Sequence, residues 1–253
     1  MTTISLRPDT ADSFVYQSVV EQNEYRIPEQ LHPDDRIIDI GAHIGSFSYL
    51  CWQRGSRNIE AFEPHPENAE LARHNLQGTG VVLHNKGVWR SDLEQPLTLY
   101  HSGFAVAAQF LYRPISFVAN SQVSSGLADE EISPDGTNTG GGDIFAETGQ
   151  PVETVSLDEV IGDKKVKILK IDCEGSEFPI LLTCKRLSQV ETIVGEYHIL
   201  EKIPPKARIE GIEQYTPGVL ADLLMSKRFR VEFIPNTRFD YVGNFFAYNL
   251  DAV

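Results

Sequence analysis

Residues 36–47, with the sequence RIIDIGAHIGSF, have the residue types of a ligand-binding turn between a strand and a helix. An apolar run reaches Asp39, and Gly41 and Gly45 then permit a sharp turn and a close approach of the backbone to a ligand. A second apolar run at 59–62 ends in Glu63. The interval between the two acids is close to the roughly 20 residues at which a Rossmann-type unit places an acid for ribose hydroxyls.

The glycine pattern indicates which kind of nucleotide this turn suits. It is Asp-x-Gly-x-x-x-Gly and not the Gly-x-Gly-x-x-Gly that holds a pyrophosphate. A ribose acid without a pyrophosphate turn favours a nucleoside that lacks phosphates, and S-adenosylmethionine is the obvious candidate. The expected cofactor-binding residues are Asp39, Gly41, His43, Gly45, Phe47, Glu63, Pro64, Asn85 and Asp172.

Each of these residues also has a structural alternative. Asp39 either orients the turn or accepts a hydrogen bond from the methionine ammonium, and Glu63 is expected to accept from the ribose hydroxyls. His43 either contacts substrate or supports the turn. Asn85, or the backbone beside it, is placed to contact adenine, whereas Trp89 is expected in the core or the pocket wall.

A second group of chemical residues lies in two later segments. The segment 171–177, IDCEGSE, contains Asp172, Glu174 and Glu177, and the segment 196–198 contains Glu196 and His198. Asp172 and Glu174 are expected to point toward a common site beside the donor methyl, whereas Glu177 suits the first turn of a helix. Glu196 and His198 share a face under strand alternation.

Two roles for this group stay open. His198 is a candidate general base, because histidine changes charge near neutral pH. Alternatively, a divalent metal held by Asp172, Glu174 and Glu196 lowers the pKa of an acceptor hydroxyl. Oxygen ligands alone suit magnesium, and adding His198 favours a transition metal.

The surrounding pattern predicts the elements that position these residues. Strands are expected at 37–40, 59–62, 81–84, 96–100, 166–171, 192–197, 230–234 and 244–248, and helices at 46–52, 66–76, after 175, and at 218–227. This alternation predicts an α/β, Rossmann-like sheet of seven mostly parallel strands. Helices cover both faces, and one antiparallel strand lies near the C-terminus.

The whole of 1–253 is interpreted as a single domain. A helical lead-in is expected within 1–35, with its pattern at 10–30 ended by Pro28. The alternation fails at 103–150, which contains a glycine-rich stretch. A segment of this length is expected to cover the acceptor side of the site and to supply specificity, or else to be a surface insert.

Composition excludes several classes of protein. The net charge of −14 argues against nucleic acid and anionic membranes as partners, since both need a basic face. No apolar run approaches the roughly 20 residues of a spanning helix, and the first residues do not resemble a signal segment. Cys51, Cys173 and Cys184 form no Cys-x-x-Cys pair, which favours a reducing, cytoplasmic compartment and no zinc site.

Together these motifs resemble the FkbM-type family of S-adenosylmethionine-dependent methyltransferases. The resemblance rests on DIGAHIGSF at 39–47, AFEPHPEN at 61–68, SLDEV at 156–160, KIDCEGSE at 170–177 and EYH at 196–198. It implies a class I methyltransferase fold and O-methylation of a sugar, glycan or polyketide hydroxyl. It also implies that Asp39, Gly41 and Glu63 bind the cofactor, and that Asp172, Glu174 and His198 face the acceptor. Cys173 and the insert at 126–150 depart from the family pattern.

Three other classes of protein compete with this interpretation. A nicotinamide-dependent dehydrogenase would need the Gly-x-Gly-x-x-Gly pattern, which is missing. A nucleic-acid amino methyltransferase would need an Asn-Pro-Pro-Tyr-type block at the position where Asp172-Cys173-Glu174 stands. A non-catalytic, Rossmann-like binding module would not need these acids. The expected partner is a small-molecule or glycan acceptor, and the sequence does not indicate the oligomeric state.

Overall fold

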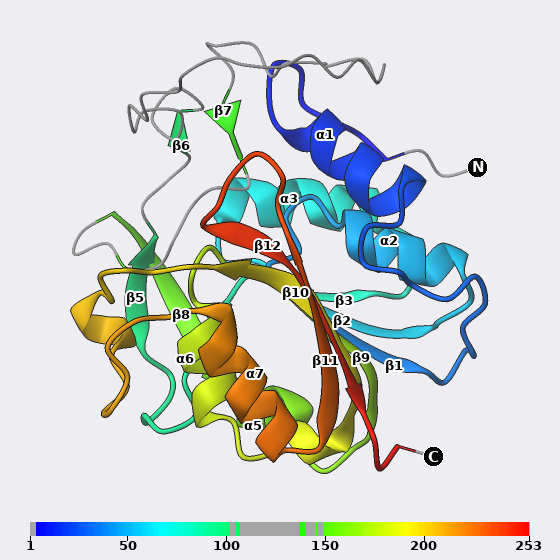
Figure 1. Ribbon diagram of the computed structural model, residues 1–253. Coiled ribbons are helices and arrows are strands. Elements are labelled where there is room, and N and C mark those ends of the chain that lie inside the picture. Colours follow the sequence, from blue (N-terminus) through cyan, green and yellow to red (C-terminus); the bar gives the residue numbers. More distant parts are fainter. Residues whose placement is uncertain (1–3, 102–104, 107–136, 140–144, 146–148, 253) are drawn as a thin grey trace, which may run out of the picture.

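The computed structural model describes residues 4–101, 105–106, 137–139, 145 and 149–252. A seven-stranded sheet forms the centre of the molecule (Figure 1). In spatial order its strands are β11 (Phe229–Pro235), β12 (Val242–Asn249), β10 (Val190–His198), β9 (Val166–Ile171), β1 (Arg36–Ile40), β2 (Asn58–Phe62) and β3 (Val82–His84). All neighbouring pairs are parallel except those of β12, which runs antiparallel to both β10 and β11. The predicted fold class is therefore confirmed.

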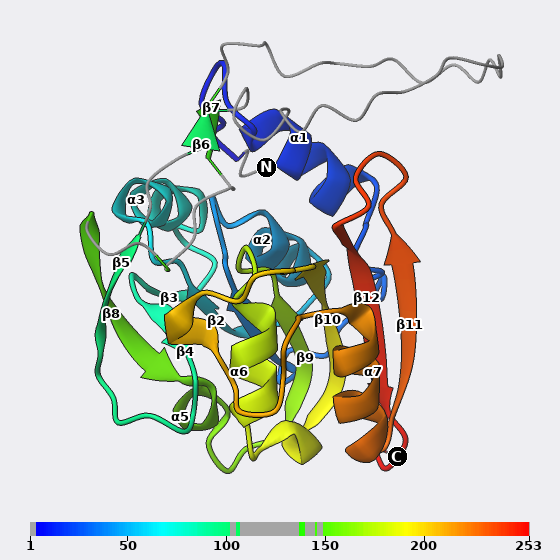
Figure 2. The same cartoon turned by 60° about the vertical axis from the view of Figure 1, so that its left-hand side comes forward.

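Helices cover both faces of this sheet, as the views in Figures 1 and 2 show. One face carries α1 (Asp12–Tyr16), the π-helical turn η1 (Gln17–Glu21), α2 (Ser46–Gln53) and α3 (Pro66–Asn75). The other face carries α5 (Leu157–Ile161), α6 (Glu177–Thr183) and α7 (Pro217–Ser226). Two short 3₁₀ turns, η2 (Leu187–Gln189) and η3 (Pro205–Ala207), lie in the connections.

Strand alternation assigns neighbouring residues to opposite cores. On β1, Ile38 and Ile40 pack in the core beneath α5–α7, whereas Ile37 packs in the core beneath α2. Asp39 lies on the same face as Ile37, because side chains two residues apart share a face. The same rule places Lys170, Asp172, Glu196 and His198 on the α2 face, with Ile168 and Val194.

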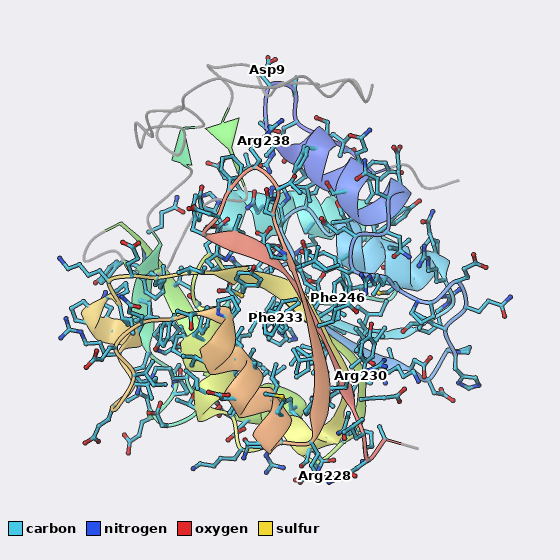
Figure 3. The ribbon with its side chains drawn as sticks, in the orientation of Figure 1. Asp9, Arg228, Arg230, Phe233, Arg238 and Phe246 are labelled. Atoms are coloured by element: carbon cyan, nitrogen blue, oxygen red, sulfur yellow. The ribbon has the colours of Figure 1, made fainter. Side chains whose placement is uncertain are left out.

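The N-terminal lead-in is shorter than its sequence pattern suggests. Helical structure ends at Glu21, not at Pro28, and Asn23 and Arg26 then adopt positive φ angles of 52° and 53°. Arg26 pairs with Glu232 on β11 at 2.9 Å, and its guanidinium lies over the ring of Phe246, 4.1 Å from the centroid. The lead-in is thereby fastened to the β11–β12 edge of the sheet, and Figure 3 labels Phe246 about halfway along these strands.

A small second sheet follows the first three strands and was not expected as such. It consists of β5 (Thr98–His101), β8 (Gln150–Ser156) and β4 (Gly87–Trp89), and β8 leads into α5 through a capping box between Ser156 and Glu159. The predicted strand at 96–100 corresponds to β5. A two-stranded pair joins β6 (Ala105–Val106) to β7 (Thr137–Asn138). Most of 103–150 lies outside the described residues, so its role over the acceptor stays a prediction, as does the single-domain organisation.

The register of β1 against β9 places a buried ion pair at the centre of the sheet. Asp39 lies beside Lys170 in the parallel ladder, and Lys170 Nζ is 3.5 Å from Asp39 Oδ1. Asp39 is fully buried and Lys170 is 4% exposed. Burial alone would lower the pKa of Lys170, but the carboxylates around it, led by Asp39, raise that pKa. Lys170 therefore stays charged, and each partner depends on the other.

Removing one member of this pair leaves an uncompensated buried charge. Lys170→Met is expected to lower the free energy of unfolding by about 3–5 kcal/mol, whereas the double variant Asp39→Asn/Lys170→Met recovers a large part of that loss. Urea denaturation of both variants and of the parent tests this. Equal stability of the single variant and the parent would contradict the pairing.

Candidate active site

Glu63 is held at the end of β2 by two backbone amides. His43 N donates to Glu63 Oε2 at 2.8 Å, and His65 N donates to Oε1 at 2.9 Å. Burial raises the pKa of this carboxyl to about 7, against the effect of the amide donors. A carboxylate oxygen can accept more than one hydrogen bond, as an acid that binds two vicinal hydroxyls requires.

The turn at residues 41–45, which the sequence predicts to contact the cofactor and which we call the cofactor turn, passes close to the next strand end. A Cβ at Gly41, where φ is +76°, would lie 1.9 Å from the carbonyl oxygen of Asp172, so only glycine fits there. Gly45 has a φ of 89° and caps the N-terminus of α2. The turn and Asp172 are therefore neighbours across the β1–β9 boundary.

Asp39 lies beneath this turn. Ser48 Oγ on α2 donates to Asp39 Oδ2 at 2.7 Å, and Lys170 Nζ donates to Gly41 O at 2.6 Å. Of the two roles expected for Asp39, this geometry favours orienting the turn.

Residues from two distant segments cover the turn. We call Arg7, Asp12 and Thr139 the N-terminal cover. Thr139 Oγ1 donates to Asp12 Oδ1 at 2.9 Å and lies 2.8 Å from His43 Nε2, while Arg7 Nη2 donates to Asn68 Oδ1 at 2.8 Å. Figures 1 and 2 both show α1 and the β6–β7 pair at this end of the sheet, and Figure 3 labels Asp9 and Arg238 at the same end.

The other expected cofactor residues occupy different positions. Asn85 is exposed and its amide donates to the carbonyls of Glu63 and Pro64 at 2.9 and 3.0 Å, which fixes the end of β2. Phe47 is buried and meets the edge of the Tyr25 ring at a centroid distance of 5.6 Å. Trp89 is 1% exposed and belongs to the core, as expected.

The second group converges at the ends of β9 and β10. We call Asp172, Glu174, Glu177, Glu196 and His198 the acid–histidine cluster. His198 Nε2 lies 3.3 Å from Glu196 Oε2 and 3.4 Å from Glu174 Oε2. Ligand atoms of Asp172, Glu196 and His198 all lie within 4.8 Å of one another. The structure thus brings together every residue expected beside the acceptor.

Glu177 has a larger part in this cluster than the sequence indicated. It stands in the first turn of α6, as expected, but it is fully buried and accepts from Cys173 N at 2.6 Å and from Gly175 N at 3.0 Å. Its Oε1 lies 3.3 Å from His198 Nδ1. Glu177 therefore faces Nδ1 of the imidazole from the first turn of α6 and orients the ring.

Two residues of the lead-in reach the same cluster and were missed. Tyr25 Oη donates to Asp172 Oδ2 at 3.0 Å, across 147 positions of sequence. Burial, together with the charges of Asp172 and Glu196, raises the pKa of Glu24 to about 8. Lys170 was also missed, although a lysine flanked by Leu169 and Ile171 in a mostly apolar strand was a signal that could have identified it.

The carboxylates determine the protonation of the histidine. Burial alone would lower the pKa of His198, but Glu177 and Glu174 raise it well above its usual value. Burial also raises the pKa of Glu174 to about 8, and His198 opposes this rise. The carboxylates therefore favour the protonated form of His198 when no other cation lies beside it.

The fold and these two groups define a Rossmann-like methyltransferase domain. The model of the methyltransferase FkbM domain matches residues 39–230, so the chain belongs to that family. The recognition made from the sequence motifs is confirmed.

Three curated relatives resemble this chain. It is 27% identical to the 31-O-demethyl-FK506 methyltransferase FkbM of Streptomyces tacrolimicus, over 73% of this chain and 74% of that protein. It is 25% identical to the hexuronic acid methyltransferase AglP of Haloferax volcanii, over 67% of this chain and 59% of that protein. It is 26% identical to the AMB antimetabolite synthetase AmbE of Pseudomonas aeruginosa, over 86% of this chain. The chain spans 10% of AmbE.

None of the helices in the described parts of the chain combines the length and apolar character needed to cross a membrane.

His43 makes the stability of the N-terminal cover depend on pH. Burial lowers the pKa of His43 to about 4. The positive charges of Arg7 and Lys170 also lower this pKa, whereas the negative charges of Asp12 and Asp172 raise it. The unfolded chain therefore binds more protons than the folded chain between about pH 6.5 and 4, and stability falls as the pH drops through that window.

His43→Asn removes this titration and suits the positive φ of 52° at that position. The parent should lose up to about 3 kcal/mol more than the variant between pH 7 and 4. Parallel denaturant titrations at several pH values measure the difference. Identical pH dependence of the two proteins would refute a neutral, buried His43.

Proposed function

We propose that this chain transfers a methyl group from S-adenosylmethionine to a hydroxyl oxygen of a sugar, glycan or polyketide-type small molecule. The proposal depends most on the close contact between the backbone of Gly41 and the carbonyl group of Asp172. This contact places the cofactor turn beside the acid–histidine cluster. Family membership supports the methyl donor. The hexuronic acid and FK506 methyltransferases among the relatives support a hydroxyl acceptor.

The reaction requires alignment more than activation of the donor, since the sulfonium is already electrophilic. The acceptor oxygen attacks the methyl carbon in line with sulfur. The C–O bond forms as the methyl–sulfur bond breaks, and the electron pair of that bond stays on sulfur. The hydroxyl proton passes to the acid–histidine cluster. Holding the three atoms in line is a proximity and orientation effect.

The residues divide between donor and acceptor. Glu63 binds the ribose hydroxyls, the cofactor turn lies along the methionine part, and Asp39 orients that turn. Asp172, Glu174 and His198 face the acceptor. Deprotonation takes place either through these side chains alone or with a divalent metal. The three free cysteines support a reducing, cytoplasmic location.

Glu63→Gln is the direct test of the donor site. Because the Glu63 carboxyl has a pKa of about 7, binding is measured at about pH 8, where most of it is ionised. The substitution then removes a charged acceptor from the ribose and should weaken S-adenosylmethionine binding by about 1.5–3 kcal/mol. Isothermal calorimetry measures this. Glu67→Gln, an exposed acid in the first turn of α3, is the matched control and should bind like the parent. An unchanged dissociation constant for Glu63→Gln would remove this residue from the cofactor site.

His198→Ala tests the acceptor side. Turnover should fall by about 10²–10⁴, the range for a disrupted proton-transfer site, because His198 orders the acids that receive the hydroxyl proton. S-adenosylmethionine affinity should stay nearly intact. Methyl transfer from labelled donor to a panel of glucuronides and polyketide macrolactones supplies the assay. His74→Ala, an exposed histidine on α3, is the control. Turnover near the parent value would exclude His198 from the chemistry.

A further inference from the structure

We propose that Asp172, Glu196 and His198 form a divalent transition-metal site, with Glu177 as the residue that orients the histidine. This inference rests on the proposed function, because the metal would lie beside the acceptor hydroxyl. It takes up the alternative in which His198 joins the ligands and favours a transition metal, and it leaves Glu174 out of the ligand set.

The distances of the three donors suit one ion. Two ligands at about 2.1 Å from a metal lie at most about 4.2 Å apart. The donor atoms lie within 4.8 Å of one another already, so small side-chain rotations bring all three onto one cation. Glu196 and His198 lie on β10, where they pair with β12, and Asp172 directly follows β9. The β9–β10 ladder ends at the pair Ile171–Gly195, so these residues leave the sheet side by side.

His198 has the surroundings of a metal ligand. It is 9% exposed, and its Nδ1 is buried without a well-aligned hydrogen bond among the described residues. Nδ1 faces the Glu177 carboxylate at 3.3 Å, while Nε2 faces Glu196. A ligating histidine commonly directs its second nitrogen at a carboxylate in this way, which fixes the tautomer.

The other ligands are also oriented from outside the set. Tyr25 Oη donates to Asp172 Oδ2 at 3.0 Å, and Lys170 Nζ lies 3.8 Å from the same oxygen. Two main-chain amides hold Glu177 in place. Such outer contacts orient metal ligands in proteins.

The charge of the cluster matches a dication. Four acidic side chains, those of Asp172, Glu174, Glu177 and Glu196, surround His198, and Lys170 is the cation beside them. A histidine must be neutral to ligate a metal, so His198 supplies no positive charge when it holds the ion. The acids then outnumber Lys170, and this partly buried group needs a further counter-charge.

The donor types indicate which metals fit. One imidazole with two carboxylates favours Mn²⁺, Fe²⁺, Co²⁺ or Zn²⁺ over Ca²⁺, and it leaves coordination positions for an acceptor oxygen. A hydroxyl bound there loses its proton more readily. Glu174, which is outside the ligand set and 3.4 Å from His198 Nε2, is placed to accept that proton.

Manganese is the probe for the experiment. The full chain, freed of metal with a chelator and dialysed, is titrated with Mn²⁺ while the electron paramagnetic resonance signal of free Mn²⁺ is followed. We expect one site per chain. Asp172→Asn, Glu196→Gln and His198→Gln should each weaken it more than tenfold, and Glu177→Gln should weaken it tenfold to a hundredfold as a positioning residue. Glu29→Gln, an exposed acid of the lead-in, should leave it unchanged.

Several outcomes would overturn the site: no stoichiometric binding by the parent, or binding that survives Asp172→Asn and His198→Gln. Thermal melting curves identify any variant that fails to fold, and the parent titration is independent of the variants. S-adenosylmethionine binding and methyl transfer are measured separately with chelator present. Methyl transfer that persists in chelator refutes the metal and leaves the proposed function standing. Mn²⁺ binding at one site, without methyl transfer to any acceptor, supports the metal site and contradicts the proposed function.

Discussion

The charged contact between Lys170 and Asp39 is the constraint on which both halves of the site depend. One ammonium group, 4% exposed, lies 3.5 Å from Asp39, donates to the Gly41 carbonyl at 2.6 Å and lies 3.8 Å from Asp172. A charge buried this deeply is retained only when its partners surround it. Lys170 thereby fixes the turn at 41–45 against the end of β9, and the distance between this turn and the acid–histidine cluster is set inside the sheet.

The lead-in makes a second connection, from outside the sheet. Tyr25 reaches Asp172, and Asp12 reaches His43, so one short segment contacts both the acid–histidine cluster and the cofactor turn. Arg26 anchors this segment to Glu232 on β11. A displacement of the lead-in would therefore change both regions together. The core strands have no such freedom, because they are hydrogen-bonded on both sides.

The sequence predicted those features of the fold and site that depend on local patterns of a few residues. The apolar strands, the Gly41–Gly45 turn and the strand-end acids were all found, because alternation, glycine chemistry and the carboxyl-end rule act over a few residues. Long-range pairing was not accessible in this way: Tyr25 lies 147 positions from Asp172, and nothing near it in sequence marks it as a contact of that acid. The lead-in helix was extended to Pro28 because its apolar spacing continues. The helix actually ends before Asn23, whose side chain holds the following turn. Asn23 Nδ2 donates to the carbonyl oxygen of Ile27, and Ile27 N donates to Asn23 Oδ1.

Charge also links the metal site to the proposed reaction. The donor sulfonium is a cation that becomes neutral as its methyl group leaves, so a purely negative surrounding stabilises the ground state more than the transition state. The same carboxylates also oppose deprotonation of an acceptor hydroxyl, because they repel the developing negative oxygen. A dication held by Asp172, Glu196 and His198, as we propose, would reverse both effects at once. The cluster that is unfavourable for methyl transfer when it holds only protons becomes favourable when it holds a metal, and a concentration of acids beside a cationic donor is then chemically consistent.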